Sequence, residues 1–237
     1  MQKTGITLLA IIVIIICAGL VWYVMGSGSE QNGQEGVSAQ TQELRDQLPN
    51  VVAVVNGEEI GKNQFLTLGE QIALQQTNEG GDISSSDMQL EISNQALNLL
   101  VNQALLVQAA EAAGTQVGDT VDQQYAQLVQ SAGGVEEFEA QLQQANTTQE
   151  QIREDLRAQL LIQTHLENKL NLEGITVTEE EINQFYEQLV AQQGEGTPAL
   201  EELRDQIAAQ LQNQKEAQVV NQYLTQLRED ADIQVNI

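Results

Sequence analysis

The stretch Val51-Val52-Ala53-Val54-Val55-Asn56-Gly57-Glu58-Glu59-Ile60 decides how the rest of the chain can fold. It places β-branched residues before an Asn-Gly pair, in a chain that otherwise has the periodicity of helices. Asn-Gly favours a tight type I′ turn, because both central residues of that turn need a positive φ. The stretch therefore predicts a β-hairpin, with one strand through Val55 and a short return strand through Ile60.

The predicted hairpin needs further support, because two strands alone are only marginally stable in water. The other clear strand candidate is residues 233–237, which are apolar at alternate positions. If this segment pairs with the hairpin, the two ends of the folded region lie side by side. The helices between them then form a loop closed by the sheet.

The composition narrows the possible functions. Of 237 residues, 41% are hydrophobic and only 3% aromatic, so the core must be aliphatic. There are 34 Asp and Glu against 9 Lys and Arg, which gives a formal net charge of −25. This charge argues against binding to nucleic acid or to anionic lipid, since both depend on basic side chains. The single Cys17 excludes an internal disulfide, and the single His165 leaves little scope for zinc or histidine-based catalysis.

Residues 5–25 are apolar apart from Thr7 and are predicted to form an uncleaved transmembrane anchor. As a helix they would span roughly 31 Å, which matches the hydrocarbon core of a bilayer. Trp22 and Tyr23 lie at one end, where aromatic rings prefer the membrane interface. A cleaved signal peptide is the alternative, but its apolar region is shorter, about 7–15 residues.

The flanks of this segment predict its orientation and the domain boundaries. Lys3 lies on the short side and the long side is acidic, which predicts a cytoplasmic tail at residues 1–4. Residues 26–48 are rich in Gly, Ser, Gln and Glu, so we expect a flexible linker. Residues 49–237 are then a single, mainly α-helical domain outside the cytoplasm.

The hydrophobic periodicity of this domain predicts amphipathic helices joined by short polar turns. The second of them has apolar residues around much of its circumference, so we expect other elements to cover it on more than one side. The predicted helices are residues 62–76, 86–113, 119–131, 135–144, 147–172, one that opens at residue 178, and one of roughly 30 residues that opens at residue 197.

Capping patterns give the starts of three of these helices. Thr147 to Glu150 and Thr178 to Glu181 both match the Thr-x-x-Glu capping box. Thr197 is suited to the N-cap of the last helix and Pro198 to its first position.

No catalytic, cofactor-binding or metal-ligating residue is predicted, and no glycine-rich phosphate loop is present in the sequence. Ser84, Ser85 and Ser86 precede Asp87 and fit a helix start better than a nucleophile. His165 has no second His or Cys near it and is predicted to be a partly exposed helix residue. Glu179, Glu180 and Glu181 lie in the first turn of a helix, where the helix dipole favours acidic residues, so we prefer that explanation to a metal site.

The order of these elements resembles the SurA, PrsA and PpiD group of extracytoplasmic folding factors. The resemblance begins at the hairpin and Phe65 and continues through residues 96–117, 138–166 and 175–186. Residues 198–237 resemble the closing helix and strand of that family. The resemblance implies a SurA-like chaperone core that binds unfolded polypeptides without ATP and without a cofactor.

One departure from the family pattern has a functional meaning. In full-length members, a parvulin-type prolyl isomerase domain follows the helix that Phe185 and Tyr186 represent here. Such a domain needs about a hundred residues, but only residues 189–197 join the two helices. The resemblance therefore implies a chaperone domain that lacks the isomerase and is not an enzyme. The anchor and linker resemble the PpiD arrangement.

These patterns together predict a single-pass protein of the cell membrane, with its N-terminus cytoplasmic and its helical domain periplasmic or otherwise extracytoplasmic. Its expected partners are unfolded or newly translocated polypeptides, the membrane, and the secretion translocon. Two alternatives stay open. One is a non-catalytic adaptor that binds a specific envelope or translocon partner, and the other is a residual member of the prolyl isomerase family.

Overall fold

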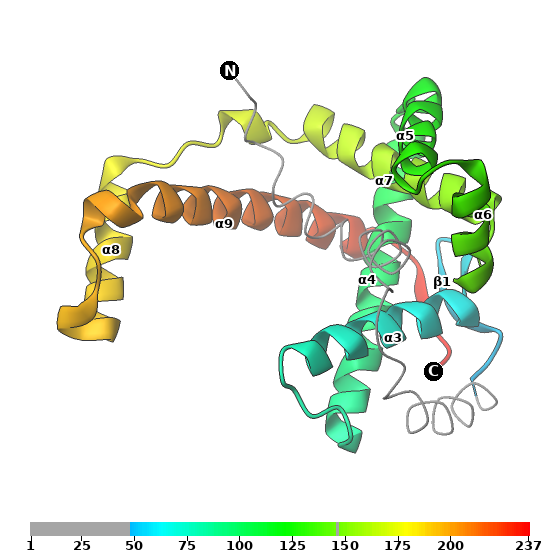
Figure 1. Ribbon diagram of the computed structural model, residues 1–237, viewed down its shortest axis with the longest axis horizontal. Coiled ribbons are helices and arrows are strands. Elements are labelled where there is room, and N and C mark those ends of the chain that lie inside the picture. Colours follow the sequence, from blue (N-terminus) through cyan, green and yellow to red (C-terminus); the bar gives the residue numbers. More distant parts are fainter. Residues whose placement is uncertain (1–47, 146) are drawn as a thin grey trace.

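The computed structural model describes residues 48–145 and 147–237, and it shows a mainly helical protein with a small three-stranded antiparallel sheet (Figure 1). The fold class predicted for this part of the chain is confirmed. In chain order the elements are β1 Val51–Val55, β2 Glu58–Gly61, α3 Lys62–Asn78, α4 Ser86–Ala112, α5 Gly118–Ser131, α6 Val135–Gln144, α7 Gln149–Lys169, the short 3₁₀ helix η1 Leu172–Gly174, α8 Glu179–Gln193, the 3₁₀ helix η2 Gly194–Gly196, α9 Leu200–Glu229 and β3 Ile233–Val235.

The predicted membrane anchor, residues 5–25, lies outside the described residues. Across residues 48–145 and 147–237, no helix combines the length and apolar character needed to cross a membrane.

The hairpin forms as predicted, and its turn has the expected backbone. Asn56 has a φ of 52° and Gly57 a φ of 89°, so both central residues lie in the left-handed region. β1 and β2 pair antiparallel, with Val55 opposite Glu58 beside the turn. The Asn-Gly pair thus fixes the register of the first two strands.

The third strand comes from the far end of the chain. β3 pairs antiparallel with β1, with Ile233 opposite Val55, which gives the strand order β2-β1-β3. Beyond β3, the backbone N–H of Asn236 donates to the carbonyl of Val52 at 2.9 Å. The predicted pairing of the last segment with the hairpin is confirmed, although only Ile233–Val235 of that segment is strand.

Asn56 joins the turn to two other parts of the molecule. Its backbone N–H donates to the carbonyl of Asp232 at 2.8 Å, and its Oδ1 accepts the N–H of Asp232 at 2.9 Å. Its Nδ2 donates to Oε1 of Gln108 on α4 at 2.8 Å, and Nε2 of Gln108 donates to the carbonyl of Val55 at 3.0 Å. The same residue that permits the turn therefore also holds the sheet against α4.

The hydrophobic core consists of three groups of buried side chains. The first packs the sheet against α3 and the first part of α4, and the second packs α5, α6, α7 and the end of α4. The third lies where α4, α7 and α9 meet and consists of Leu106, Ile162, Leu166, Val220 and Leu224. α4 contributes to all three groups, which confirms that this helix is covered on more than one side.

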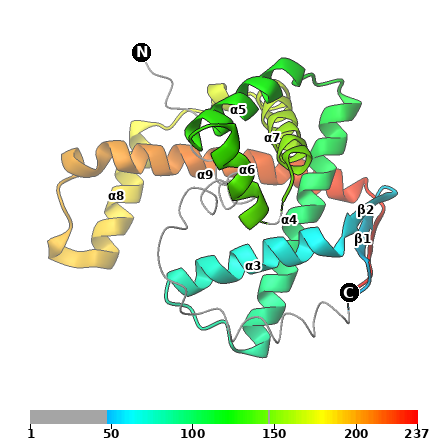
Figure 2. The ribbon, with the colours of Figure 1, turned by 45° about the vertical axis from the view of Figure 1, so that its right-hand side comes forward.

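α8 and residues 200–215 of α9 extend away from these three groups, and both views show this part as a projection at one end of the molecule (Figures 1 and 2). We call it the helical arm. α8 packs against α9, burying Ile182 and Ile207, and neither residue belongs to the three core groups. Residues 170–178 lead from α7 into the arm, and residues 194–199 connect its two helices.

The predicted start and end of α7 are wrong. Its N-cap is Thr148, whose hydroxyl accepts the N–H of Gln151 at 3.2 Å, while Oε1 of Gln151 accepts the N–H of Thr148 at 3.0 Å. The capping box is therefore Thr-x-x-Gln, one residue later than Thr147 to Glu150, because Gln provides the same acceptor as Glu. At its other end α7 stops at Lys169, and Leu172 already belongs to η1.

The predicted start of the last helix is also wrong. α9 begins at Leu200, and Ala199 is its N-cap. Thr197 instead donates its hydroxyl to the carbonyl of Gly194 at 2.9 Å, within the preceding turn. The carbonyl of Pro198 accepts the hydroxyl of Tyr186 at 3.0 Å, so these two residues close the turn between α8 and α9.

Candidate functional site

His165 is buried, with 4% of its surface exposed, so the prediction of a partly exposed residue is wrong. Its Nε2 lies 2.8 Å from the hydroxyl of Tyr223, because α9 returns to cover this side of α7. Burial, followed by the nearby Lys169, lowers the pKa of His165, and burial raises the pKa of Tyr223. The pair is thus a hydrogen bond between two uncharged side chains beside the third core group, where it joins two helices.

The serine run begins a helix, as predicted. Ser85 is the N-cap of α4, and its hydroxyl accepts the N–H of Met88 at 3.2 Å. Within the described ranges, no group of three or more His, Cys, Asp or Glu side chains is arranged to hold a metal ion. Cys17 lies outside those ranges.

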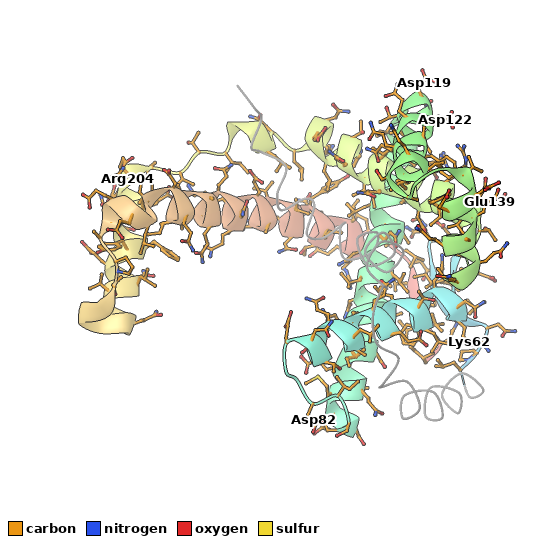
Figure 3. The ribbon with its side chains drawn as sticks, viewed as in Figure 1. Lys62, Asp82, Asp119, Asp122, Glu139 and Arg204 are labelled. Atoms are coloured by element: carbon orange, nitrogen blue, oxygen red, sulfur yellow. The ribbon has the colours of Figure 1, made fainter. Side chains whose placement is uncertain are left out.

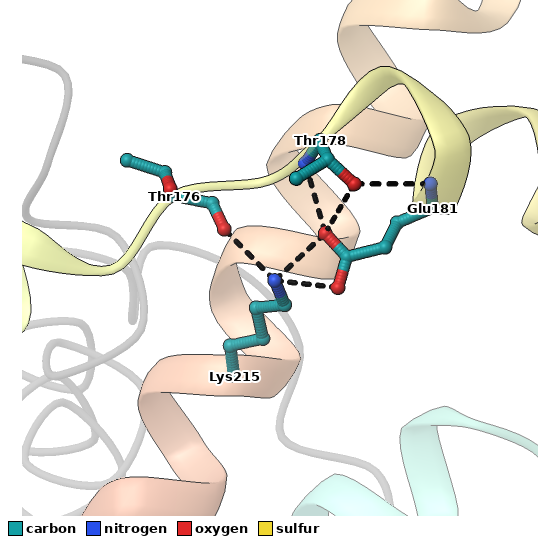
Figure 4. Close-up of polar contacts among 4 residues, drawn as sticks. All are labelled: Thr176, Thr178, Glu181 and Lys215. Atoms are coloured by element: carbon teal, nitrogen blue, oxygen red, sulfur yellow. Dashed lines mark hydrogen bonds and ion pairs between the residues drawn. The ribbon is translucent and has the colours of Figure 1, made fainter.

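Glu181, in the predicted acidic first turn of α8, is the centre of a polar cluster at the inner end of the helical arm (Figure 4). Its carboxylate oxygens lie 2.6 and 2.7 Å from Nζ of Lys215 on α9, which also donates to the carbonyl of Thr176 at 2.8 Å. Oε2 of Glu181 accepts the N–H of Thr178 at 2.8 Å and so completes the predicted capping box.

These contacts hold Glu181 in its charged form. The hydrogen bond from Lys215, and next that from the backbone of Thr178, lower the pKa of Glu181 to about 2. The carboxylate is therefore ionised at neutral pH. The cluster explains the acidic turn structurally, since it fastens residues 170–178 and the start of α8 to α9.

A second ion pair lies nearer the outer end of the helical arm. Arg204 of α9, labelled in Figure 3, pairs with Glu179 of α8. Both side chains are largely exposed, so this pair contributes little to stability. The arm is thus joined across its two helices mainly by the Glu181 cluster and by a small apolar contact.

The helical arm leaves several of its large apolar side chains partly uncovered. Ile182 and Ile207 are its two buried apolar side chains among the residues that can be described. Val190 is exposed. Five other large apolar side chains of the arm are half-buried: Phe185, Leu189, Leu200, Leu203 and Leu211. No other element of the described chain packs extensively on α8 apart from α9 and the adjoining η2. The arm therefore offers an apolar surface on a projecting element.

Exposed apolar side chains also occur in three other places, one of which is Val135, 60% exposed at the start of α6. Leu74 and Leu90 are 60% and 63% exposed, near the connection between α3 and α4. Val235 and Ile237 are about half exposed, at the outer side of the sheet. Exposed apolar side chains of this kind are suited to contacts with other polypeptides.

Acidic side chains cover the lobe formed by α5, α6 and the start of α7. Asp119, Asp122 and Glu139 lie on its outer surface (Figure 3). Arg153 pairs with Asp122, and its guanidinium lies 3.8 Å from the ring centre of Tyr125. The lobe thus combines an aliphatic and aromatic interior with a negatively charged exterior.

The fold and its surfaces define a class of protein: a mainly helical domain that is closed by a hairpin and a distant strand. Residues 1–166 match the family model described as the SurA-like N-terminal domain, so the chain belongs to this family. The resemblance inferred from the sequence is thereby confirmed. The comparisons with curated proteins and with solved structures produced no match.

Proposed function

We propose that this protein is a membrane-anchored folding factor that binds unfolded or newly translocated polypeptides outside the cytoplasm. It acts as a holdase, which shields apolar segments of a client and releases them by dissociation, without ATP and without covalent chemistry. Membership of the SurA-like family supports a chaperone-type role. The finer function rests on the surface of the helical arm.

The helical arm is the observation that carries this proposal. It projects from the body (Figure 1). Most of its large apolar side chains are half-buried or exposed. Apolar side chains that are left partly uncovered together on one projecting element form a surface that another polypeptide can cover. The helical arm also carries charged side chains, among them the ion pair of Arg204 with Glu179. An apolar surface with a polar rim binds many sequences with modest affinity, as a holdase requires.

The apolar segment at residues 5–25 supports the proposed anchor, and Lys3 supports its orientation with the N-terminus in the cytoplasm. An anchored holdase would meet clients at a high local concentration as they leave the translocon, which is the partner we propose on the membrane side. The short connection at residues 194–199 leaves no room for an isomerase domain between α8 and α9, which supports a non-enzymatic role.

The test is an aggregation assay with the full chain purified in mild detergent and no nucleotide. Several unrelated unfolded proteins are diluted into buffer with and without it, and light scattering is followed. We expect the wild type to suppress aggregation of all of them. The variant Leu189→Ser in the helical arm should suppress less, while Val135→Ser, at an exposed position of α6, should behave as wild type.

The alternatives give different results in the same preparation. No suppression of any client, together with tight binding to a single envelope protein, would show that the chain is an adaptor. Acceleration of prolyl isomerisation in a short peptide above the uncatalysed rate would show that it retains an enzyme activity.

A further inference from the structure

The outer edge of β3 has backbone groups that no other strand of the described chain uses. Asn56 and Asp232 are hydrogen-bonded across β1 and β3, and so are Val52 and Asn236. In an antiparallel pair, bonded and non-bonded positions alternate along the strand. Ile233 and Val235 therefore occupy the non-bonded positions, with their N–H and C=O groups directed away from β1.

The side chains beside this edge continue the apolar face of the sheet past the core. Ile233 packs against the first core group, whereas Val235 and Ile237, on the same face by alternation, are about half exposed. A strand added here could place its own apolar side chains against these two residues.

The other edge of the sheet is protected in a way that β3 is not. β2 presents Glu58 and Glu59, both exposed, and leads directly into α3. Charged residues and a covering helix are the usual means by which natural proteins prevent pairing at an edge. The three residues of β3 itself carry no charge, and no helix of the described chain packs extensively on this strand, so the two edges differ.

The charges around β3 determine which kind of polypeptide segment can bind at its outer edge. Glu229, Asp230 and Asp232 are exposed and form no ion pair within the described residues, and the nearest base, Arg228, is bonded to the side chains of Asn98 and Asn102. A second copy of β3 would bring the same acidic residues and another net charge of −25, so self-pairing is disfavoured. An extended segment with Lys or Arg between its apolar residues is complementary.

We propose that the outer edge of β3 binds an extended client segment by strand addition, with backbone hydrogen bonds to Ile233 and Val235. The preferred segment alternates apolar and basic residues, so that one face packs on Val235 and Ile237 while the other meets the acidic residues. This inference rests on the proposed holdase function and gives it a second binding mode, separate from the helical arm.

The variant Val235→Pro tests the backbone part of the proposal. Proline removes the outward N–H of residue 235 without removing a hydrogen bond to β1, and an edge strand tolerates proline where the N–H faces solvent. Val235→Lys is a second variant, because it keeps the backbone and places a positive charge against a basic peptide. Leu90→Ser is the matched control, since it removes an exposed apolar side chain far from the sheet.

The probes are two fluorescent peptides of equal charge, Lys-Val-Lys-Val-Lys-Val-Lys and Lys-Val-Lys-Pro-Lys-Val-Lys, bound to the full chain in mild detergent. Fluorescence anisotropy should show that the first peptide binds more tightly than the second. Val235→Pro and Val235→Lys should weaken binding of the first peptide by about tenfold or more, and Leu90→Ser should not. Hydrogen exchange of the segment after α9 should slow when the first peptide is bound.

Three results would overturn this inference. The first is equal binding of both peptides, which would indicate charge attraction alone. The second is that both Val235 variants bind the first peptide as tightly as the wild type does. The third is a wild-type dimer that Val235→Pro dissociates. The aggregation assay keeps the two proposals separate. If the wild type suppresses aggregation but the peptide results fail, only strand addition is wrong, and if the wild type suppresses nothing, the holdase function itself is wrong.

Discussion

Two titratable side chains of α7 respond to burial in opposite ways. His165 is buried and its pKa is lowered, whereas Asp155 is half-buried and its pKa is raised to about 6, first by burial and then by Glu154. In both cases burial favours the neutral form. For a base this means that the folded chain binds a proton less readily than the unfolded chain, and for an acid it means the reverse.

The two residues should therefore change the pH dependence of stability with opposite signs. As the pH falls below about 6.5, the unfolded chain protonates its histidine before the folded chain does, so His165 lowers the free energy of unfolding. As the pH falls through about 6 towards about 4, the folded chain protonates Asp155 first, so this residue raises that free energy.

Urea unfolding of His165→Gln, Asp155→Asn and wild type between pH 7.5 and pH 4.5 measures both effects. The free energy of unfolding can change by at most about 1.4 kcal/mol per pH unit for one proton. Relative to wild type, His165→Gln should lose less stability on acidification and Asp155→Asn should lose more. A parallel shift of both curves, with no change of slope, would show that neither group changes its pKa on folding.

At the scale of the element, the start of α7 separates two adjacent threonines. Thr148 caps the helix by accepting the N–H of Gln151, whereas Thr147 lies outside the cap and only shares the same side-chain oxygen. We expect Thr148→Ala to lower the free energy of unfolding by about 1 kcal/mol and Thr147→Ala to lower it by less than about 0.5 kcal/mol. Chemical unfolding of the two variants gives both values, and equal losses would contradict the assigned N-cap.

The sequence predicted the elements whose causes are local. Asn56 and Gly57 indicated the turn, and Thr178 with Glu181 indicated the start of α8, because in each case the deciding contacts lie within a few residues. Thr147 and Thr148 could not be distinguished in this way, since both are followed three residues later by a side chain that can complete a capping box.

The pairing of the last strand with the hairpin was predicted, but contacts between the side chains of distant helices were not. His165 is buried because α9 covers α7, and the pairing of these helices leaves no local pattern. The partner of Glu181, Lys215, is likewise on a different helix, so the sequence explained the acidic first turn only by the helix dipole and the capping box. The apolar surface of the helical arm has the same periodicity as a buried helix face, and only the structure shows that most of it is left partly uncovered.

At the scale of the molecule, stability should be uneven. The helical arm shares none of the three core groups, so it can open without disrupting the sheet, α4 or α7. Hydrogen exchange should therefore be faster in α8 and residues 200–215 than in α4 and α7. Lys215→Met should accelerate exchange in the arm only, because it leaves Glu181 without its cation.

Arg153→Met is the control for this experiment, since it removes an ion pair from the lobe of α5 and α7 and should leave the arm unchanged. Equal protection of the arm and the body would mean that the two parts unfold together, and the arm would then be part of the same cooperative unit.

The sheet also determines when the protein can finish folding. Asn56 and Asp232, which are hydrogen-bonded across β1 and β3, lie 176 residues apart in the sequence. The hairpin is among the first parts of the domain to be synthesised, and β3 follows after every helix. Until β3 emerges, the hairpin has only two strands and its inner edge is open, a state that is marginally stable and able to pair with other chains. The sheet is therefore completed only after every helix of the described domain, including α9, has been made.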